Sequence, residues 1–323
     1  MQLFAIFNRD GGRLSTIDLA SLCRSVRRHF RAAGYRVAGC HVIGRRALLK
    51  TLEDAANRGR PGDVLLAGGG DGTISAAAAL AFRSGMTLAV VPAGTMNLFA
   101  RAASLPLDPV EAVEELADGE VEAVDIATAN GRPFVHQFSV GLHSRLVQIR
   151  QGYSYRGQLG KMLASLRAMA SAVIRPPLFE VEIHTGGRAE RCLASAISVS
   201  NNLVAEGHMP HPDSLDAGTL GLYVAKPMSP WAMARLCISV LLGRWKQNPL
   251  VTERAVESVT LTFPRRKASA KAVIDGELVR LAPRIELGMH AGGLQLLVPR
   301  THMADARPES ALTLRQNVVI AGN

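Results

Sequence analysis

The chain has 323 residues, which exceeds one average domain, so we expect two domains. It is 48% hydrophobic and 20% charged, as in an ordinary globular protein, and we find no internal repeat or low-complexity segment. Lysine and arginine outnumber aspartate and glutamate by 37 to 27, which favours anionic partners; nucleic acid is disfavoured because aromatic residues make up only 5% and no compact basic run interleaves with them.

The first part of the chain alternates predicted strands and helices. Strands are expected at 3–7, 35–42, 63–67 and 87–91, and helices at 16–33, 47–57, 74–82, from about 97, and at 108–117. This alternation predicts an α/β domain whose parallel sheet is covered by helices on both faces. We assign it to residues 1–124.

The rhythm changes near Glu120, where strand-like stretches with turn signals take over. These stretches are 179–184, 192–199, 220–225, 256–263, 271–281 and 294–298, and two helices, at about 158–174 and 230–243, interrupt them. We therefore predict a second, mainly antiparallel β domain at residues 125–300 and a loose tail at 301–323.

The sequence gives little sign of export or of a membrane span. The apolar start lacks the basic region of a signal peptide, and the longest apolar helix candidate, 231–242, contains Arg235 and is too short to cross a bilayer. The cysteines are far apart and form no CxxC pair; they are Cys23, Cys40, Cys192 and Cys237. This spacing argues against a zinc site and against a disulfide framework, so we expect a soluble protein of the reducing cytoplasm.

A glycine-rich loop follows the third predicted strand. The run Gly68-Gly69-Gly70-Asp71-Gly72-Thr73 lies between this strand and a helix, at the edge where open α/β sheets bind ligands. Glycine lets backbone N–H groups approach a phosphate, and the helix N-terminus adds partial positive charge. Asp71 would be a poor direct neighbour for phosphate but a good partner for phosphate-bound Mg²⁺. The run lacks the Gly-Lys-Ser/Thr of a P-loop, and alone it would favour a plain structural turn.

A second loop repeats this arrangement one strand later. Gly94-Thr95 follows the fourth strand, and Asn97 stands where a helix begins, which by itself indicates an ordinary N-cap. Two such loops on neighbouring parallel strands would converge on one crevice. This coincidence favours a nucleotide site.

The motif "GGGDGT", followed one βα unit later by "PAGTMNLFAR", resembles the diacylglycerol kinase catalytic family, which includes bacterial lipid kinases and the sphingosine and ceramide kinases. The first motif is shared with NAD kinases, whereas the second points to the lipid branch. The resemblance extends over about residues 1–300. It implies a fold like that of NAD kinase and diacylglycerol kinase, ATP and Mg²⁺ as cofactors, and transfer of the γ-phosphoryl group to a lipid alcohol such as diacylglycerol, a step of phospholipid biosynthesis.

The resemblance also implies roles for single residues. It places the ATP phosphates over the two loops. Asn8, in a loop after the first strand, would be one nucleotide-binding residue, and the others would be Gly69, Gly70, Gly72, Thr73, Gly94, Thr95 and Asn97. Asp71 would organise Mg²⁺, and Asp125 falls where the family keeps an aspartate of the carboxylate network near the metal. Glu277, in "IDGE", matches the family's general base, although Asp275-Gly276 alone predicts only a hairpin turn.

The sequence also departs from the family's pattern. The first loop, 8–12, lacks the usual proline and serine, Leu98 stands where many members have an acidic residue, and Ala217 replaces the aspartate of a structural Mg²⁺ site. Three functions therefore stay open: a lipid kinase, an NAD kinase-like enzyme acting on a soluble substrate, and an inactive lipid- or nucleotide-binding regulator. Basic charge would hold a lipid kinase at the anionic inner face of a membrane. The lipid and a homodimeric state also stay open.

Overall fold

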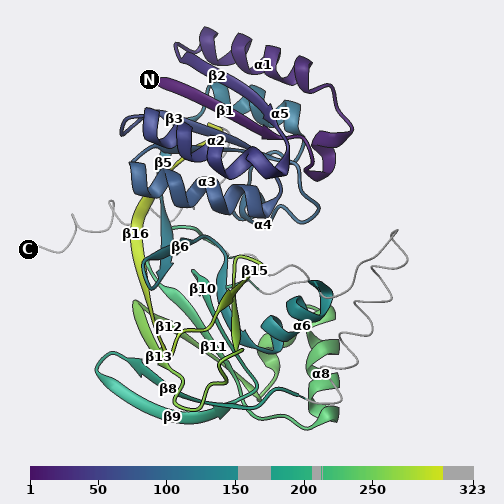
Figure 1. Cartoon of the computed structure of the whole chain (residues 1–323), viewed down its shortest axis with the longest axis vertical. Helices are drawn as coiled ribbons and strands as arrows, with labels where there is room; N and C mark the ends of the chain where they lie inside the picture. Colours follow the sequence, from purple (N-terminus) through teal and green to yellow (C-terminus); the bar gives the residue numbers. More distant parts are fainter. Residues whose placement is uncertain (152–175, 206–211, 213, 301–323) are drawn as a thin grey trace, which may run out of the picture.

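A computed structural model describes residues 1–151, 176–205, 212 and 214–300 (Figure 1). An α/β domain built from the start of the chain lies at one end of the molecule, and a domain rich in strands lies at the other. This architecture confirms the predicted fold class. The helix expected at 158–174 and the tail at 301–323 lie outside the described residues.

The N-terminal domain contains a parallel sheet in the order β2-β1-β3-β4. Its strands are β1 (Gln2–Asn8), β2 (Arg36–Ile43), β3 (Val64–Gly69) and β4 (Thr87–Pro92). The helices are α1 (Leu19–Ala32), α2 (Arg45–Arg58), α3 (Asp71–Ser84), α4 (Leu98–Ala102) and α5 (Pro109–Ala117), with a 3₁₀ turn at Gly12–Ser15. Helix α1 packs against α5 and α2 packs against α3. Every residue of β3 and β4 is buried, as expected for central strands covered on both faces.

Two long strands join the domains. Strand β5 (Glu120–Ala129) pairs antiparallel with β16 (Arg284–Val298), which also pairs with β4 of the first domain and with β13 of the second. The early residues of β16, such as Leu287, belong to the core of the second domain, whereas the late ones, such as Leu296, belong to the core of the first. One sheet therefore runs through both domains, although the sequence predicted only the last residues of β16.

The second domain adds a six-stranded sheet in the order β12-β11-β10-β7-β14-β15, with antiparallel pairing throughout. Its strands are β7 (Gln137–Gly141), β10 (Ala196–Asn201), β11 (Leu220–Ala225), β12 (Val251–Val256), β14 (Lys271–Ile274) and β15 (Glu277–Arg280). The remaining elements are β6 (Arg132–Phe134), β8 (Phe179–Thr185), β9 (Arg188–Ala194), β13 (Ser258–Thr262), α6 (Leu142–Gln151), α8 (Pro230–Leu241) and a 3₁₀ turn at Trp245–Gln247.

Three local expectations for this half need correction. The single strand expected at 192–199 is two strands, because the chain breaks at Ser195, whose N–H donates to Ala225 O (2.8 Å). The stretch expected at 271–281 is a hairpin that turns at Asp275-Gly276. Strands β5, β6 and β7 and helix α6 carried no clear sequence signal and were missed.

The expectation about cysteines was also wrong. Cys23 in α1 and Cys40 in β2 form a disulfide, with their Cα atoms 6.0 Å apart. The two cysteines are 17 residues apart, and this spacing gave no indication of a disulfide. They meet because α1 packs back over β2 and brings the two side chains together. Cys192, in β9, is a free thiol, and burial is the main reason that its pKa is raised.

None of the described helices is both long enough and apolar enough to span a membrane.

Asp125 is buried in β5 at the junction of the two cores, with 1% of its surface exposed. Its carboxylate accepts hydrogen bonds from the N–H groups of Gly218 (2.6 Å) and Gly292 (2.9 Å). Its backbone N–H donates to Leu215 O (2.6 Å), and its carbonyl accepts from Asn201 Nδ2 (3.0 Å). Asp125 therefore fastens the segment before β11 and the irregular middle of β16 to β5, the strand that connects the domains.

We expect Asp125→Ala to lower the free energy of unfolding by about 2–4 kcal/mol, because two buried N–H groups lose a charged acceptor. Asp125→Asn, which retains one acceptor oxygen, should lose less. Exposed Asp118, changed to alanine, is the control and should shift stability by no more than about 0.5 kcal/mol. Denaturant unfolding without Mg²⁺ measures these values. An Asp125→Ala protein of normal stability that binds Mg²⁺ poorly would contradict the structural role.

Candidate active site

Three loops meet at the carboxyl ends of β1, β3 and β4. The amide of Asn8 donates to Thr73 Oγ1 (3.2 Å), which ties the first loop to the start of α3. The N–H of Arg13 donates to Ala93 O (2.9 Å), and the N–H of Ala93 donates to Gly69 O (2.8 Å). The predicted loops are thus connected by hydrogen bonds into one edge.

Glycines at this edge permit an unusually close backbone contact. A Cβ on Gly94 would lie 2.7 Å from Gly70 Cα and 2.9 Å from Asn97 Oδ1, so any larger residue would push the loops apart. Gly70 has φ −86°, so its backbone is not left-handed. Glycine is favoured there because the backbone of Gly94 lies so close. Gly72 differs from both, because a Cβ on it would meet no atom within 4 Å. The first turn of α3 therefore faces open space.

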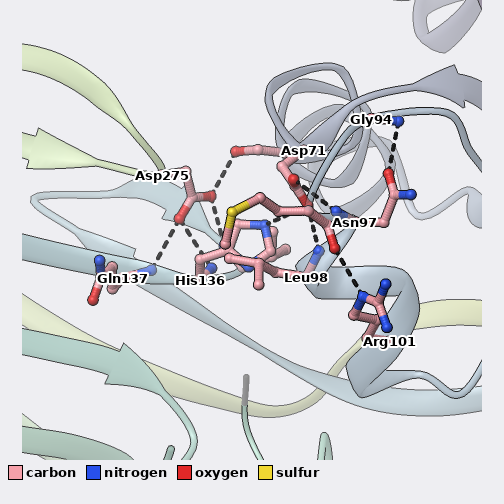
Figure 2. A network of polar contacts seen from close by, with 11 residues as sticks. Asp71, Gly94, Asn97, Leu98, Arg101, His136, Gln137 and Asp275 are labelled. Carbon is pink, nitrogen blue, oxygen red and sulfur yellow. Dashed lines mark hydrogen bonds and ion pairs between the residues drawn. The ribbon is translucent and has the colours of Figure 1, made fainter. Parts of the chain in front are cut away.

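Asp71 is the first residue of α3, and its carboxylate points at the start of α4 (Figure 2). It accepts hydrogen bonds from the N–H groups of Leu98 (2.7 Å) and Asn97 (3.1 Å). Asn97 has a left-handed backbone, φ 50°, and its Oδ1 accepts from the N–H of Gly94 (2.7 Å). Asp71 therefore caps a neighbouring helix and fixes the second loop against the first.

Asp275 is the main polar link between the domains (Figure 2). One carboxylate oxygen accepts from the N–H groups of His136 (2.9 Å) and Gln137 (3.0 Å), and the other accepts from the N–H of Val135 (2.9 Å) and from Ser75 Oγ (2.6 Å). Ser75 lies on α3, so this one carboxylate joins the β14–β15 hairpin, the start of β7 and the first domain. Asp275 and Gly276 both have positive φ, which makes the two-residue hairpin turn that the sequence indicated.

His136 lies between the two aspartates. Its backbone is held by Asp275, its Nε2 is 3.7 Å from Asp71 Oδ1, and its ring packs edge-on against Phe99 of α4. The Nε2 atom is buried and has no hydrogen-bond partner among the described residues, while 13% of the side chain is exposed. Sequence reasoning missed His136 and Asp275, because an isolated histidine and a turn aspartate carry no spacing signal; only the approach of β6 and β7 to α3 and α4 reveals them.

Glu277 is the first residue of β15, two positions beyond Asp275. Its side chain is 68% exposed and forms an ion pair with Arg132 of β6. It therefore lies on the hairpin that Asp275 ties to α3, and its carboxylate is open to solvent.

The structure brings most of the predicted site residues to the loop edge; these are Asn8, Gly69, Gly70, Asp71, Gly72, Thr73, Gly94, Thr95 and Asn97. Asp125 is not among them, because its polar contacts are with Gly218, Gly292, Leu215 and Asn201. No cluster of three metal-ligating side chains occurs within the described part of the chain. Of the two carboxylates predicted to bind metal, Asp71 and Asp125, Asp71 is the one that lies at the loop edge.

Comparison with known proteins finds a sequence match that includes the loops of this edge. Residues 2–129 match the family model described as the diacylglycerol kinase catalytic domain. The N-terminal part of the chain is therefore similar to that family. This match confirms the resemblance drawn from the two glycine motifs.

Relatives extend the similarity beyond this domain. The chain is 26% identical over 263 residues to an uncharacterized protein of Synechocystis, covering 78% of this chain but only 59% of that protein. It is 24% identical over 222 residues to a diacylglycerol kinase of Staphylococcus saprophyticus, covering 66% of this chain and 70% of that enzyme. A crystal structure of a diacylglycerol kinase from Bacillus anthracis superposes with a TM-score of 0.66 at 20% identity, over 93% of this chain and 98% of that one. The last similarity is one of fold.

Asp275 gives the sharpest test of how the site is assembled. We expect Asp275→Ala to lower the free energy of unfolding by about 2–4 kcal/mol, because three backbone N–H groups and one hydroxyl lose an ionised acceptor. Ser75→Ala, which removes only the first-domain partner, should lose about 1 kcal/mol. Asp216→Ala is the control, since Asp216 is exposed and its hydrogen bonds within the described residues are to Ser214 in its own turn. Unchanged denaturant unfolding of Asp275→Ala would refute the linking role.

Proposed function

We propose that this protein is an ATP-dependent lipid kinase that transfers the γ-phosphoryl group to the hydroxyl of a lipid alcohol such as diacylglycerol. The observation that carries this proposal is the contact between the two glycine loops, with Asp71 at its centre and the Asp275–Glu277 hairpin fastened beside it. The loop edge of the first domain, which we propose binds phosphate, thus lies beside a hairpin of the second domain that carries a carboxylate. The family match of residues 2–129 supports the same chemistry.

The start of α3 suits the phosphates of ATP. The N–H groups of Thr73 and Ile74 donate to Gly70 O, whereas those of Asp71 and Gly72 belong to the first turn, which has no intrahelical acceptor. The space that a side chain at position 72 would occupy is open, because Gly72 has none and no protein atom lies within 4 Å of the position of a Cβ there. Phosphate oxygens would accept from these N–H groups and gain from the positive end of the helix.

The residues present also suit one Mg²⁺ ion. Each oxygen of Asp71 accepts one backbone N–H and retains lone-pair capacity, and 25% of the side chain is exposed. Mg²⁺ typically keeps several waters and uses one or two protein carboxylates beside substrate phosphates, so Asp71 alone is sufficient. When bound, the ion would neutralise charge on the phosphoryl group. Leu98 contributes its backbone N–H to Asp71 and no carboxylate of its own.

Glu277 is the proposed general base. The lipid hydroxyl oxygen would attack the γ-phosphorus, the bond from phosphorus to the β,γ-bridging oxygen would break, and the hydroxyl proton would pass to the Glu277 carboxylate. Arg132, which pairs with Glu277, orients this carboxylate before substrate arrives. Such bases contribute a factor of roughly 10²–10⁴, and the remaining rate enhancement would come from the positioning of ATP over the loops.

An inactive lipid- or nucleotide-binding regulator is the second candidate. Two observations favour it: Leu98 offers no metal ligand, and the Glu277 carboxylate is paired with Arg132. A soluble acceptor, as in NAD kinases, is the third. We propose peripheral contact of the lipid kinase with an anionic membrane, since Lys and Arg exceed Asp and Glu by 37 to 27.

Gly72→Ala tests the nucleotide edge without disturbing the fold. The added methyl group meets no protein atom within 4 Å, so the melting temperature should not fall. ATP affinity should fall by about tenfold or more, because the methyl group occupies the space assigned to phosphate. Calorimetric titration with ATP measures this. A stable Gly72→Ala protein with normal ATP affinity would show that phosphate does not approach this turn.

Glu277→Gln separates an enzyme from a binder. We expect phosphoryl transfer to diacylglycerol to fall by ~10²–10⁴, a rise in the barrier of ~3–5 kcal/mol, with ATP affinity and melting temperature preserved. Glu286→Gln is the matched control, because Glu286 is similarly exposed and pairs with Arg284. Radiolabelled phosphate transfer to lipid micelles, with NAD as the soluble acceptor, gives the rates. Full lipid kinase activity of Glu277→Gln would refute the general-base role, and ATP binding without turnover by the unaltered protein would favour the regulator.

A further inference from the structure

The second domain contains a cavity of about 590 Å³ that the proposed chemistry does not use. Its wall is mainly apolar and includes Val140, Phe179, Leu193, Phe263 and Leu281. The rings of Phe179 and Phe263 lie 6.0 Å apart, and Gly141 leaves room for the Phe179 ring, which a Cβ there would meet at 2.6 Å. A volume and lining of this kind are typical of a small-molecule site.

The rim of this cavity is cationic. Arg265, Arg266, Lys267 and Lys271 all line it. The acidic residue at the rim, Glu180, is already engaged, because it bonds to Arg191 (2.6 Å) and pairs with Arg265 (3.5 Å). The hydrogen bond from Arg191 is the main reason that the pKa of Glu180 is lowered, so this carboxylate stays ionised and neutralised by arginine.

Two rim lysines retain uncompensated charge. Lys267 and Lys271 are exposed, and neither forms an ion pair within the described residues. The Arg266 guanidinium donates to the carbonyl of Lys267 (3.5 Å) and forms no ion pair with another described residue. The rim therefore presents positive charge beside an apolar cavity, and Leu178 and Leu193 at its edge are 61% and 51% exposed.

The cavity lies away from the candidate active site. Strand β14 runs from Lys271 at the cavity to Asp275 at the domain junction, a distance of about 13 Å along an extended strand. Strand β7 runs the same span in the opposite direction, with Gln137 beside Asp275 and Gly141 at the cavity. In Figure 1 the β15 hairpin approaches the first domain, while β8 and β9, which line the cavity, lie at the far end of the molecule.

We propose that this cavity is a second ligand site, separate from the phosphoryl-transfer site, which binds a long-chain anion with its hydrocarbon chain among the apolar residues and its carboxylate or phosphate head at Lys267 and Lys271. A neutral lipid alcohol would leave the rim cations without a partner. A nucleotide would leave the apolar wall unused. Lys271 is at the opposite end of β14 from Ile274, which pairs with Glu277, so a head group held at Lys271 would be remote from the proposed general base.

Calorimetric titration below the micelle concentration tests this site on the whole chain. The probes are oleate and 1-oleoyl lysophosphatidate, which carry one chain with a carboxylate or a phosphate head, and monoolein, which carries the same chain without charge. We expect both anions to bind about tenfold more tightly than monoolein, and inorganic phosphate to compete with neither. Tighter binding of one anion than the other identifies the head group that the rim prefers.

Two variants locate the binding. Lys267→Glu with Lys271→Glu should weaken oleate binding by about tenfold or more, because two attractive charges become repulsive. Arg36→Glu with Arg188→Glu makes the same change in net charge at exposed positions outside the cavity and should have no effect. Ala270→Phe, which fills the cavity, should abolish binding of the chain. ATP affinity should stay normal in all three.

Equal affinity for monoolein and oleate would overturn the proposal, because the rim charge would then play no part. Unchanged oleate binding by the Lys267→Glu, Lys271→Glu protein would also overturn it. Displacement of oleate by diacylglycerol would assign the cavity to the substrate instead of a second ligand. These results do not depend on catalysis, so an inactive protein with an intact cavity would still bind oleate.

Discussion

The carboxylate of Asp275 is the interaction on which the arrangement of the two domains depends. It is the turn residue of a hairpin in the second domain, and it collects donors from that domain's own backbone and from Ser75 of α3. Removing any one of these donors leaves part of the carboxylate's charge without compensation and therefore costs stability. The hairpin, the start of β7 and the first helix turns beyond β3 are thereby held in one geometry. Glu277 is two residues away on the same hairpin, so its position follows from this link.

Asp71 combines two tasks at this edge. Its oxygens cap α4 through Asn97 and Leu98, and this fixes the second glycine loop against the first. The same carboxylate is the acidic group nearest to the open turn at Gly72. The proposed phosphate-binding edge is held by these hydrogen bonds before any ligand arrives, which would reduce the ordering that binding must supply. His136 adds a buried ring nitrogen facing Asp71, held from the side of the second domain.

The two proposed sites attract anions by different means. At the loop edge, the attraction would come from backbone N–H groups and a helix terminus, beside the acidic Asp71. At the far end of the second domain, lysine and arginine side chains line an apolar cavity. As proposed, the first arrangement would bind phosphate through close backbone approach, and the second would hold a head group attached to a hydrocarbon chain. The two sites would therefore differ in the class of anion that they hold.

Much of the first domain was determined by the sequence itself. Continuous apolar runs such as 64–69 and 87–92 form strands covered on both faces, and the glycines at 69, 70 and 94 stand at the strand ends because the close approach of neighbouring atoms there leaves little room for a side chain. These patterns involve residues close together in the sequence, so they can be recognised without knowing the tertiary structure. Three features depend on contacts between residues 17 to 208 positions apart: the pairing of Cys23 with Cys40, the passage of β16 through both domains, and the meeting of Asp275, Ser75 and His136. Only the tertiary structure decided them, because hydrogen bonds and buried charges act over a few ångströms of space and leave no periodicity along the chain.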